Sequence, residues 1–292
     1  MNFENFRKVA EMFYHDNPDA LITLTGGEPT MHPDFKSILE FSSYLFDKVC
    51  LTTNGSFDKE TAMFLEEYMH RNLFVQISLD GTKDFHNRLR GENAFERAEA
   101  NIELFSEVWR HLSISTTVSR DGLKNVEELA VYLNSLKFHH WKVSQEQVAQ
   151  PNKNTIIPTD EWNNFVERLL PHCRYRVNIK KMFAFDIWKK YLGSADKTNF
   201  ARNCSLGNGK VYITPQFDVL PCTCMNDTCG NFLSEPLKAI KERLYNLQLI
   251  EPDKASKCYK CNFKKICNGG CPGYSFKVFG KLNMGDIRCP LI

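Results

Sequence analysis

The sequence predicts an α/β fold with a parallel sheet, and three observations support this prediction. Between residues 20 and 145, short β-branched apolar runs alternate with longer segments whose apolar residues recur every three or four positions. The connections between these segments are mostly short, which favours right-handed βαβ units. Several apolar runs end in a small polar or acidic residue followed by glycine. In such a sheet the functional residues lie at the C-terminal ends of the strands.

The expected elements follow one another in a regular order. The chain opens with an amphipathic helix over 3–15, because its apolar residues share one helical face. Strands are expected at 21–25, 48–53, 73–79, 112–118 and 138–145, and helices at 34–46, 59–71, 94–109, 125–136 and 158–171. The series begins with a helix rather than a strand, so we expect the first strand and its loop to be missing from the N-terminal side.

Composition and charge exclude several classes of protein. The 292 residues are 42% hydrophobic and 25% charged, which is typical of a soluble globular protein. A net charge of +2 provides no basic field for nucleic acid. No apolar run approaches the roughly 20 residues of a membrane helix, and the N-terminus does not have the pattern of a signal peptide. We therefore predict a cytoplasmic protein without a nucleic-acid or membrane partner.

Three segments are expected along the chain. A core over 1–157 ends in the polar stretch "EQVAQPNKNTII", and a helical bridge over 158–203 begins with Pro158 in a first helical turn. This bridge also contains a helical stretch around "KMFAFDIWKKYLG". A cysteine-rich segment over 204–292 contains the hairpin signal "KVYITPQFDVLPC".

Cysteine is the most informative residue type. Of eleven cysteines, Cys50 and Cys173 are expected to be buried small hydrophobes. An odd number of cysteines without a secretion signal argues against disulfides and favours metal ligation for the rest. Their dense spacing suits tetrahedral zinc and iron–sulfur clusters about equally. These nine are Cys204, Cys222, Cys224, Cys229, Cys258, Cys261, Cys267, Cys271 and Cys289.

Three consecutive strand ends carry polar residues and glycine. They are Gly26-Gly27-Glu28-Pro29, "LTTNG" at 51–55 and "ISLDG" at 77–81. Glycine lets a backbone pass close to a ligand, and exposed amides beside a carboxylate can bind both an ammonium group and a carboxylate. One such loop is equally well explained as a tight turn. Three in succession predict a polar binding mouth at one edge of the sheet.

Together with "TKDFHNRLRGENAFERAEANI" after the third strand end, these motifs resemble the radical S-adenosylmethionine (radical SAM) superfamily, in its branch of peptide-modifying maturases. The resemblance covers most of residues 20–145 and implies a partial (β/α)6 TIM-like barrel that lacks its first strand. It also implies that the loop of Gly26, Gly27, Glu28 and Pro29 contacts the methionyl amine of S-adenosylmethionine (SAM). By the same resemblance Asn54, Ser78 and Asp80 face its ribose or carboxylate, and Val118 lies near its adenine. Ser78 and Asp80 are also explained as caps of the following turn.

The C-terminal cysteines resemble the small SPASM domain, which carries auxiliary [4Fe–4S] clusters in maturases of this branch. The resemblance implies a distal cluster held by Cys258, Cys261, Cys267 and Cys289, and a proximal cluster held by Cys204, Cys222 and Cys271. Cys224 and Cys229 are candidates for the fourth proximal ligand, or are bystander thiols, and the family sometimes leaves that position free for substrate. Phe217 stands where the family usually has glycine, so we expect the hairpin turn to differ.

The defining motif of the superfamily, Cys-x3-Cys-x2-Cys, does not occur in this sequence, where Cys50 alone precedes residue 173. In the family this motif follows the first strand and holds the cluster that cleaves SAM to a 5′-deoxyadenosyl radical. We therefore expect that the chain begins downstream of its natural start. Alone it is expected to be poorly stable and inactive, while a form extended upstream is expected to be active.

The leading functional hypothesis is a radical SAM/SPASM oxidoreductase that modifies a peptide or small protein, with flavodoxin or ferredoxin as reductant. The catalytic base is not identified, because Asp186, Asp218 and Asp227 are suitably placed but surface carboxylates are common. The alternatives are a non-catalytic descendant that binds peptide or transfers electrons, and a zinc-stabilised interaction module. His32, His86, His139 and His140 are expected to be structural or surface groups.

Overall fold

The computed structural model describes residues 1–190, 204, 206, 207 and 209–292, and it forms two compact units. The barrel unit consists of Asn2–Glu146 and Asn164–Lys180, and the cysteine unit consists mainly of Gln147–Asn163 and Lys181–Ile292. In the described part of the chain, no helix combines the length and apolar character needed to cross a membrane. The predicted segment boundaries at 157 and 203 stay predictions, and residues 191–203 lie outside the described residues.

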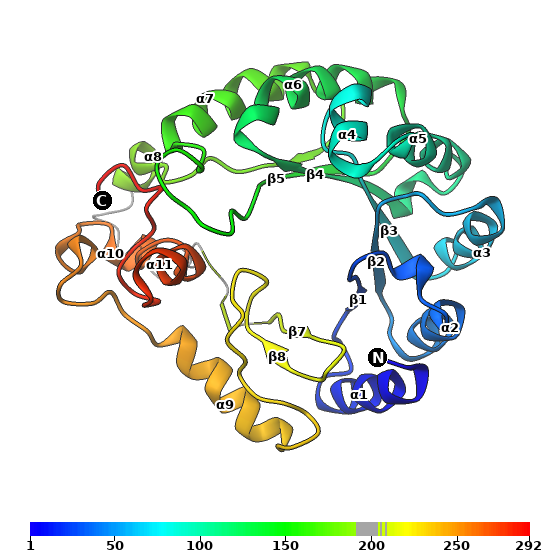
Figure 1. The fold of residues 1–292 in the computed structure, drawn as a ribbon, viewed down its shortest axis with the longest axis horizontal. Coiled ribbons are helices and arrows are strands. Elements are labelled where there is room, and N and C mark those ends of the chain that lie inside the picture. Colours follow the sequence, from blue (N-terminus) through cyan, green and yellow to red (C-terminus); the bar gives the residue numbers. More distant parts are fainter. Residues whose placement is uncertain (191–203, 205, 208) are drawn as a thin grey trace. The chain divides into compact units, whose positions relative to one another are not determined.

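The barrel unit is built on six parallel strands that pair in the order of the chain, which confirms the predicted α/β class and parallel sheet. Helices α2 to α6 lie along one face of this sheet (Figure 1). The strand β1, which is paired only with β2 in the described sheet, forms one edge. The strands are β1 (Ile22–Leu24), β2 (Val49–Thr53), β3 (Leu73–Ser78), β4 (Leu112–Val118), β5 (His140–Gln145) and β6 (Val177–Asn178).

The helices of the barrel unit lie at the predicted positions, with one addition, but the helices predicted at 94–109 and 125–136 end earlier, at Leu104 and Tyr132. The helix α4 was not predicted, because its sequence KDFHNRLR has too few apolar residues to produce a periodic pattern. The first helix begins at an Asn2 cap whose side chain accepts a hydrogen bond from the backbone N–H of Asn5. The helices are α1 (Phe3–Asp16), α2 (Phe35–Leu45), α3 (Lys59–Met69), α4 (Lys83–Arg90), α5 (Ala94–Leu104), α6 (Leu123–Tyr132) and α7 (Thr159–Leu169), the last of which continues into the barrel unit from the cysteine unit.

The two faces of the sheet differ in polarity. In β2, β3 and β4 every second residue is buried, as in Leu51, Val75 and Ile114, and these residues form part of the apolar core. The alternate positions are mostly polar and less buried, and they are in register across the sheet: Thr52 pairs with Gln76, and Gln76 pairs with Ser113. The helix-covered face therefore provides the core, while the other face presents hydroxyl and amide groups.

Two predictions about single cysteines are wrong. Cys50 and Cys173 are partly exposed rather than buried. Cys50 lies between the buried residues Val49 and Leu51, so the alternation of the strand places it on the polar face. Cys173 follows the end of a short 3-10 helix, and its thiol donates to the carbonyl oxygen of Leu169 at 3.5 Å.

The cysteine unit contains little regular structure. The expected hairpin is present as two antiparallel strands of two residues each. The helix expected around "KMFAFDIWKKYLG" is limited to five described residues, and the last residues of that stretch lie outside the described part of the chain. Three further helices were not predicted. The elements are α8 (Phe185–Lys189), β7 (Tyr212–Ile213), β8 (Val219–Leu220), α9 (Leu237–Gln248), α10 (Lys264–Cys267) and α11 (Pro272–Phe279).

Candidate cofactor and cluster sites

The Glu28 carboxylate connects the loop after β1 to the end of β2. Its Oε1 accepts hydrogen bonds from Thr30 Oγ1 and Thr53 Oγ1, each at 2.7 Å, and from Thr30 N at 3.2 Å. Its Oε2 accepts a hydrogen bond from Asn54 N at 2.7 Å. Two of these four hydrogen bonds, from Thr53 and Asn54, hold the two loops together, and the two from Thr30 stay within the loop of Glu28. Since a carboxylate offers about four acceptor sites, acceptor capacity for a ligand remains mainly at Oε2. The contact with a methionyl amine stays a prediction.

The glycines of the three strand-end motifs differ in what surrounds them. A Cβ atom added to Gly55 would lie 2.8 Å from Ile77 Cγ2, and one added to Gly81 would lie 2.7 Å from Phe85 Cδ1. These two glycines are required by the packing of the protein itself. A Cβ atom added to Gly26 or Gly27 would meet nothing within 4 Å, and both residues are exposed. Unlike Gly26, Gly27 does not have a positive φ. Neither its backbone φ nor packing within the protein therefore explains why this position is a glycine.

Asp80 is buried at the end of β3 and is paired with Arg90 of α4. The Arg90 Nε donates to Asp80 Oδ2 at 2.6 Å, and the backbone N–H of Thr117 donates to Asp80 Oδ1 at 2.9 Å. The backbone N–H of Asp80 in turn donates to Nδ1 of the fully buried His86. Asp80 thus connects β3, β4 and α4. Its side chain bonds to Arg90 and Thr117 rather than capping the turn that follows β3. The structural role predicted for His86 is confirmed by this contact.

The remaining predicted cofactor residues lie at the same edge of the sheet. Asn54 follows β2, and its Oδ1 accepts from the backbone N–H of Ser56 at 2.8 Å. Ser78 ends β3 and pairs with Ser115 in register. Val118 ends β4 and is fully buried. The sheet therefore brings the ends of β1 to β4 to one edge, as the alternation of strands and helices predicts, while the contacts of these residues with SAM stay predictions.

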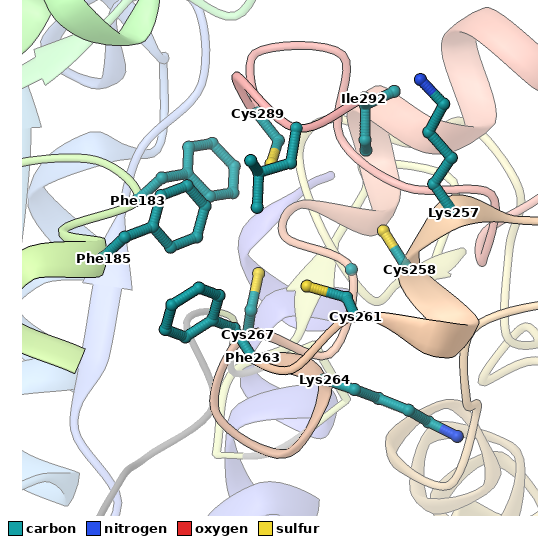
Figure 2. A pocket seen from close by; sticks show the side chains of 12 residues that line it. Phe183, Phe185, Lys257, Cys258, Cys261, Phe263, Lys264, Cys267, Cys289 and Ile292 are labelled. Atoms are coloured by element: carbon teal, nitrogen blue, oxygen red, sulfur yellow. The ribbon is translucent and has the colours of Figure 1, made fainter. Parts of the chain in front are cut away.

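Four of the predicted cluster ligands line one pocket of the cysteine unit. They are Cys258, Cys261, Cys267 and Cys289, and Figure 2 shows their sulfur atoms turned toward a common space. Phe183, Phe185 and Phe263 form an aromatic wall, in which Phe185 and Phe263 stack with ring centroids 4.6 Å apart. The convergence of four thiols from three separate chain segments on one partly apolar pocket fits a group bound by four thiolates.

Burial raises the pKa of the Cys258, Cys267 and Cys289 thiols and so favours their protonated form when no positive charge is near. It raises the pKa of Cys267 to about 12 and that of Cys289 to about 11. A bound metal centre would supply the charge that deprotonates them. In the described part of the chain, no three Cys, His, Asp or Glu side chains are arranged to hold a single metal ion. The four sulfurs surround the pocket instead.

A second group of thiols gathers near the hairpin. Cys204, Cys222 and Cys224 pack around Leu206 and Met225. The Cys224 thiol also lies close enough to the sulfurs of Cys222 and Cys271 to share its proton with either of them. The proton of Cys224 favours the thiolate of the sulfur that accepts it, and this lowers the pKa of Cys222 to about 6 and that of Cys271 to about 7. The three cysteines expected to hold the proximal cluster are thus in one place, together with Cys224.

Cys229 lies in a different part of the cysteine unit. It packs in an apolar cluster with Val219, Ile240 and Leu244. Its backbone N–H donates to Val219 O at 2.7 Å, and its carbonyl oxygen accepts from Arg243 Nε at 2.6 Å. The two candidates for the fourth proximal ligand are therefore separated by the fold, although they are five residues apart in the sequence.

One buried ion pair beside the cysteines was not predicted. Asp286 is 1% exposed, and its Oδ2 accepts from the backbone N–H of Cys271 at 3.1 Å and from Arg288 Nη2 at 2.7 Å. The backbone N–H of Cys289 donates to Asp286 O at 2.9 Å. Asp286 thus binds the backbone of a cysteine from each group. In the sequence, the opposite charges of Asp286 and Arg288 just before Cys289 were the signal from which this ion pair could have been predicted.

Phe217, in the hairpin turn, adopts a backbone conformation that is typical of glycine. Phe217 has a φ of +71° and a buried side chain. This left-handed region favours glycine, so the expectation of a different turn is not supported at this residue.

The three carboxylates considered as a catalytic base have ordinary surroundings. Asp186 and Asp227 are exposed, and Asp218 accepts a hydrogen bond from Asn231 Nδ2 at 2.8 Å.

The N-terminal part of the chain matches a known family. Residues 1–133 match the model of the radical SAM superfamily. This match covers less than half of the chain. The crystal structure of SuiB from Streptococcus suis has the same fold, with a TM-score of 0.78 and 20% identity, covering 98% of this chain and 70% of SuiB. This likeness confirms the TIM-like partial barrel. SuiB has also been solved bound to S-adenosylmethionine and bound to the precursor peptide SuiA.

The matches to two curated relatives extend over both units of the chain. The antilisterial bacteriocin subtilosin biosynthesis protein AlbA of Bacillus subtilis is 23% identical over 285 residues, which cover 93% of this chain and 60% of AlbA. The AdoMet-dependent heme synthase of Methanosarcina barkeri is 25% identical over 286 residues, which cover 89% of this chain and 79% of the synthase. The chain thus spans about three fifths of the length of AlbA.

Proposed function

We propose that this protein is a radical SAM maturase of the SPASM type, an oxidoreductase that uses SAM and auxiliary iron–sulfur clusters to modify a peptide or small protein. The observation that carries this proposal is the convergence of Cys258, Cys261, Cys267 and Cys289 on one pocket, in a chain whose residues 1–133 match the radical SAM family model. When bound, [4Fe–4S] clusters supply one-electron chemistry. This chain would hold the distal cluster with those four thiolates and the proximal one with Cys204, Cys222 and Cys271.

The proposed SAM site is the loop edge formed by the ends of β1 to β4. Gly27 supports it, because an exposed glycine without a conformational or packing reason leaves backbone open to close approach by a ligand. Gly26, Gly27, Glu28 and Pro29 would bind the methionyl group, and Asn54, Ser78, Asp80 and Val118 would line the rest. Glu28 would act chiefly by fixing the loop against Thr53 and Asn54.

The substrate, the reductant and the cellular location belong to the same proposal. A peptide substrate is supported by the names of AlbA, a bacteriocin biosynthesis protein, and of SuiB with its precursor peptide. The heme synthase is 25% identical to this chain, which is as similar as the peptide-related relatives are, so sequence identity alone does not select the substrate. Flavodoxin or ferredoxin as reductant and a cytoplasmic location are the partner and the compartment that the proposed radical SAM chemistry favours.

Iron and acid-labile sulfide analysis after anaerobic reconstitution tests the cluster part of this proposal. Two [4Fe–4S] clusters would give about eight irons and eight sulfides per chain. Combined replacement of Cys258 and Cys267 by alanine should reduce both numbers by about half, because it removes two ligands of one cluster only. Zinc without sulfide in the unmodified protein would instead support an interaction module stabilised by zinc.

Binding of SAM to a Gly27→Ala variant tests the loop. Since the added methyl group contacts nothing in the protein, the melting temperature should remain within a degree or two of that of the unmodified protein. SAM affinity in calorimetry should fall about tenfold or more, which corresponds to about 1.4 kcal/mol. Met31→Ala, at a residue that is 82% exposed next to the same loop, is the control. Equal affinity in Gly27→Ala and Met31→Ala would place the SAM site elsewhere.

A further inference from the structure

Cys224 and Cys229 have the same exposed fraction, 7%, but different neighbours. Cys224 belongs to the group that contains Cys204 and Cys222. Cys229 belongs to the apolar cluster between β8 and α9. Burial alone therefore does not distinguish the two thiols, whereas their contacts do.

Three contacts direct Cys224 toward the proximal ligands. Its backbone N–H donates to Cys222 Sγ at 3.3 Å. Its thiol lies close enough to the sulfurs of both Cys222 and Cys271 to share its proton with either of them. Cys222 comes from the end of the hairpin and Cys271 from the start of α11, so Cys224 lies where these two segments meet.

Gly273 shows that this meeting is close. A Cβ atom on Gly273 would lie 2.6 Å from Cys224 Cβ, a distance that excludes any larger residue there. The same point is 3.5 Å from Cys224 Sγ and 3.7 Å from Cys271 Sγ. The glycine two residues after Cys271 thus lets the Cys224 side chain reach the space beside the Cys271 sulfur.

We propose that Cys224 is the fourth thiolate of the proximal cluster, with Cys204, Cys222 and Cys271, and that Cys229 is not a ligand. This inference rests on the proposed function, because it assumes that the thiols bind an iron–sulfur cluster. Four protein thiolates leave no iron of a [4Fe–4S] cluster open. A substrate atom therefore does not bind to an iron of this cluster, and the cluster contributes to the reaction only by exchanging electrons.

The test uses the whole 292-residue chain, reconstituted without oxygen, and compares Cys224→Ala with the matched control Cys229→Ala. Each reduced sample is treated with isotope-labelled cyanide, which binds an open iron, and the coupling of the label is measured by electron–nuclear double resonance. We expect no coupling in the unmodified protein or in Cys229→Ala. Cys224→Ala should either show the coupling or lose about four irons and four sulfides.

Cys224→Ser covers the case in which the alanine variant does not fold. Serine preserves the size of the side chain and offers oxygen in place of sulfur, so it should shift the electron paramagnetic resonance signal of one cluster only. Cyanide coupling in the unmodified protein, or a Cys224→Ala protein that matches Cys229→Ala in iron, sulfide and spectra, would overturn the assignment. Absence of sulfide from the unmodified protein would instead overturn the proposed function.

Discussion

The barrel unit and the cysteine unit are stabilised in different ways. The twelve largest fully buried side chains among the described residues, which include Leu51, Phe105 and Trp141, all belong to the barrel unit. In the cysteine unit the strands have two residues each. The apolar clusters there are built partly from cysteines: Cys261, Cys267 and Cys289 pack against Phe183, Trp188 and Phe263.

This difference has a consequence for how each site is organised. A unit with a large apolar core can hold polar loops in place through internal hydrogen bonds, as the Glu28 carboxylate does in the barrel unit. A small unit with short strands buries too little apolar surface for this, and metal binding commonly supplies the missing free energy. We therefore expect the barrel unit to be folded without its cofactor and the cysteine unit to depend on its clusters.

The largest expected effect is that of removing the clusters. Structural metal sites contribute on the order of 10 kcal/mol to the folding of small domains. Chelation of iron should therefore abolish protection from hydrogen exchange in α10, α11 and the β7–β8 hairpin, while amides of β2, β3 and β4 keep theirs. The measurement is hydrogen exchange with mass spectrometry before chelation, after it, and after reconstitution. Equal loss of protection in both units would contradict the difference between them.

A smaller effect, confined to the barrel unit, is expected for Leu51→Ala. Leu51 is fully buried in β2, and truncation of such a side chain costs about 2–5 kcal/mol through lost burial and the cavity that remains. Urea unfolding should show this loss while the iron content stays unchanged. Leu21→Ala, at a residue that is 54% exposed in the same unit, is the control and should change the free energy of unfolding by less than about 0.5 kcal/mol. A reduced iron content in Leu51→Ala would show that the units are not independent.

The smallest effect is a pH dependence of the barrel unit. Burial lowers the pKa of His86 to about 4, although Asp80 and Glu96 oppose this and Arg90 adds to it. Between about pH 4 and 6.5 the unfolded chain binds a proton at His86 that the folded chain does not bind, so stability falls as the pH falls through this window. The free energy of unfolding should be about 2 kcal/mol lower at pH 5 than at pH 7 from this residue alone.

A His86→Gln variant isolates this contribution, since glutamine does not titrate. Its unfolding in urea at pH 7 and pH 5 should show a pH dependence smaller by that amount. If the variant and the unmodified protein lose the same free energy between the two pH values, His86 is not the origin of the pH dependence.

The sequence by itself determined the features that depend on local pattern and spacing. Apolar periodicity located the strands at 48–53, 73–79 and 112–118, which the structure confirms within a residue or two, and it indicated the parallel sheet. The resemblance to the SPASM domain implied the set Cys258, Cys261, Cys267 and Cys289, and these four residues line one pocket. Elements without a pattern were missed, such as the polar helix α4 and the two-residue strand β6.

Only the tertiary structure decided features that depend on contacts between distant segments. It distinguished Gly27, which faces open space, from Gly55, which packs against Ile77. It showed that the Glu28 carboxylate is bonded to Thr53 and Asn54, and it separated Cys224 from Cys229. The physical reason is that periodicity reports only which face of an element is buried. The partner that a side chain meets across that face depends on strand register and on the packing of segments far apart in the chain.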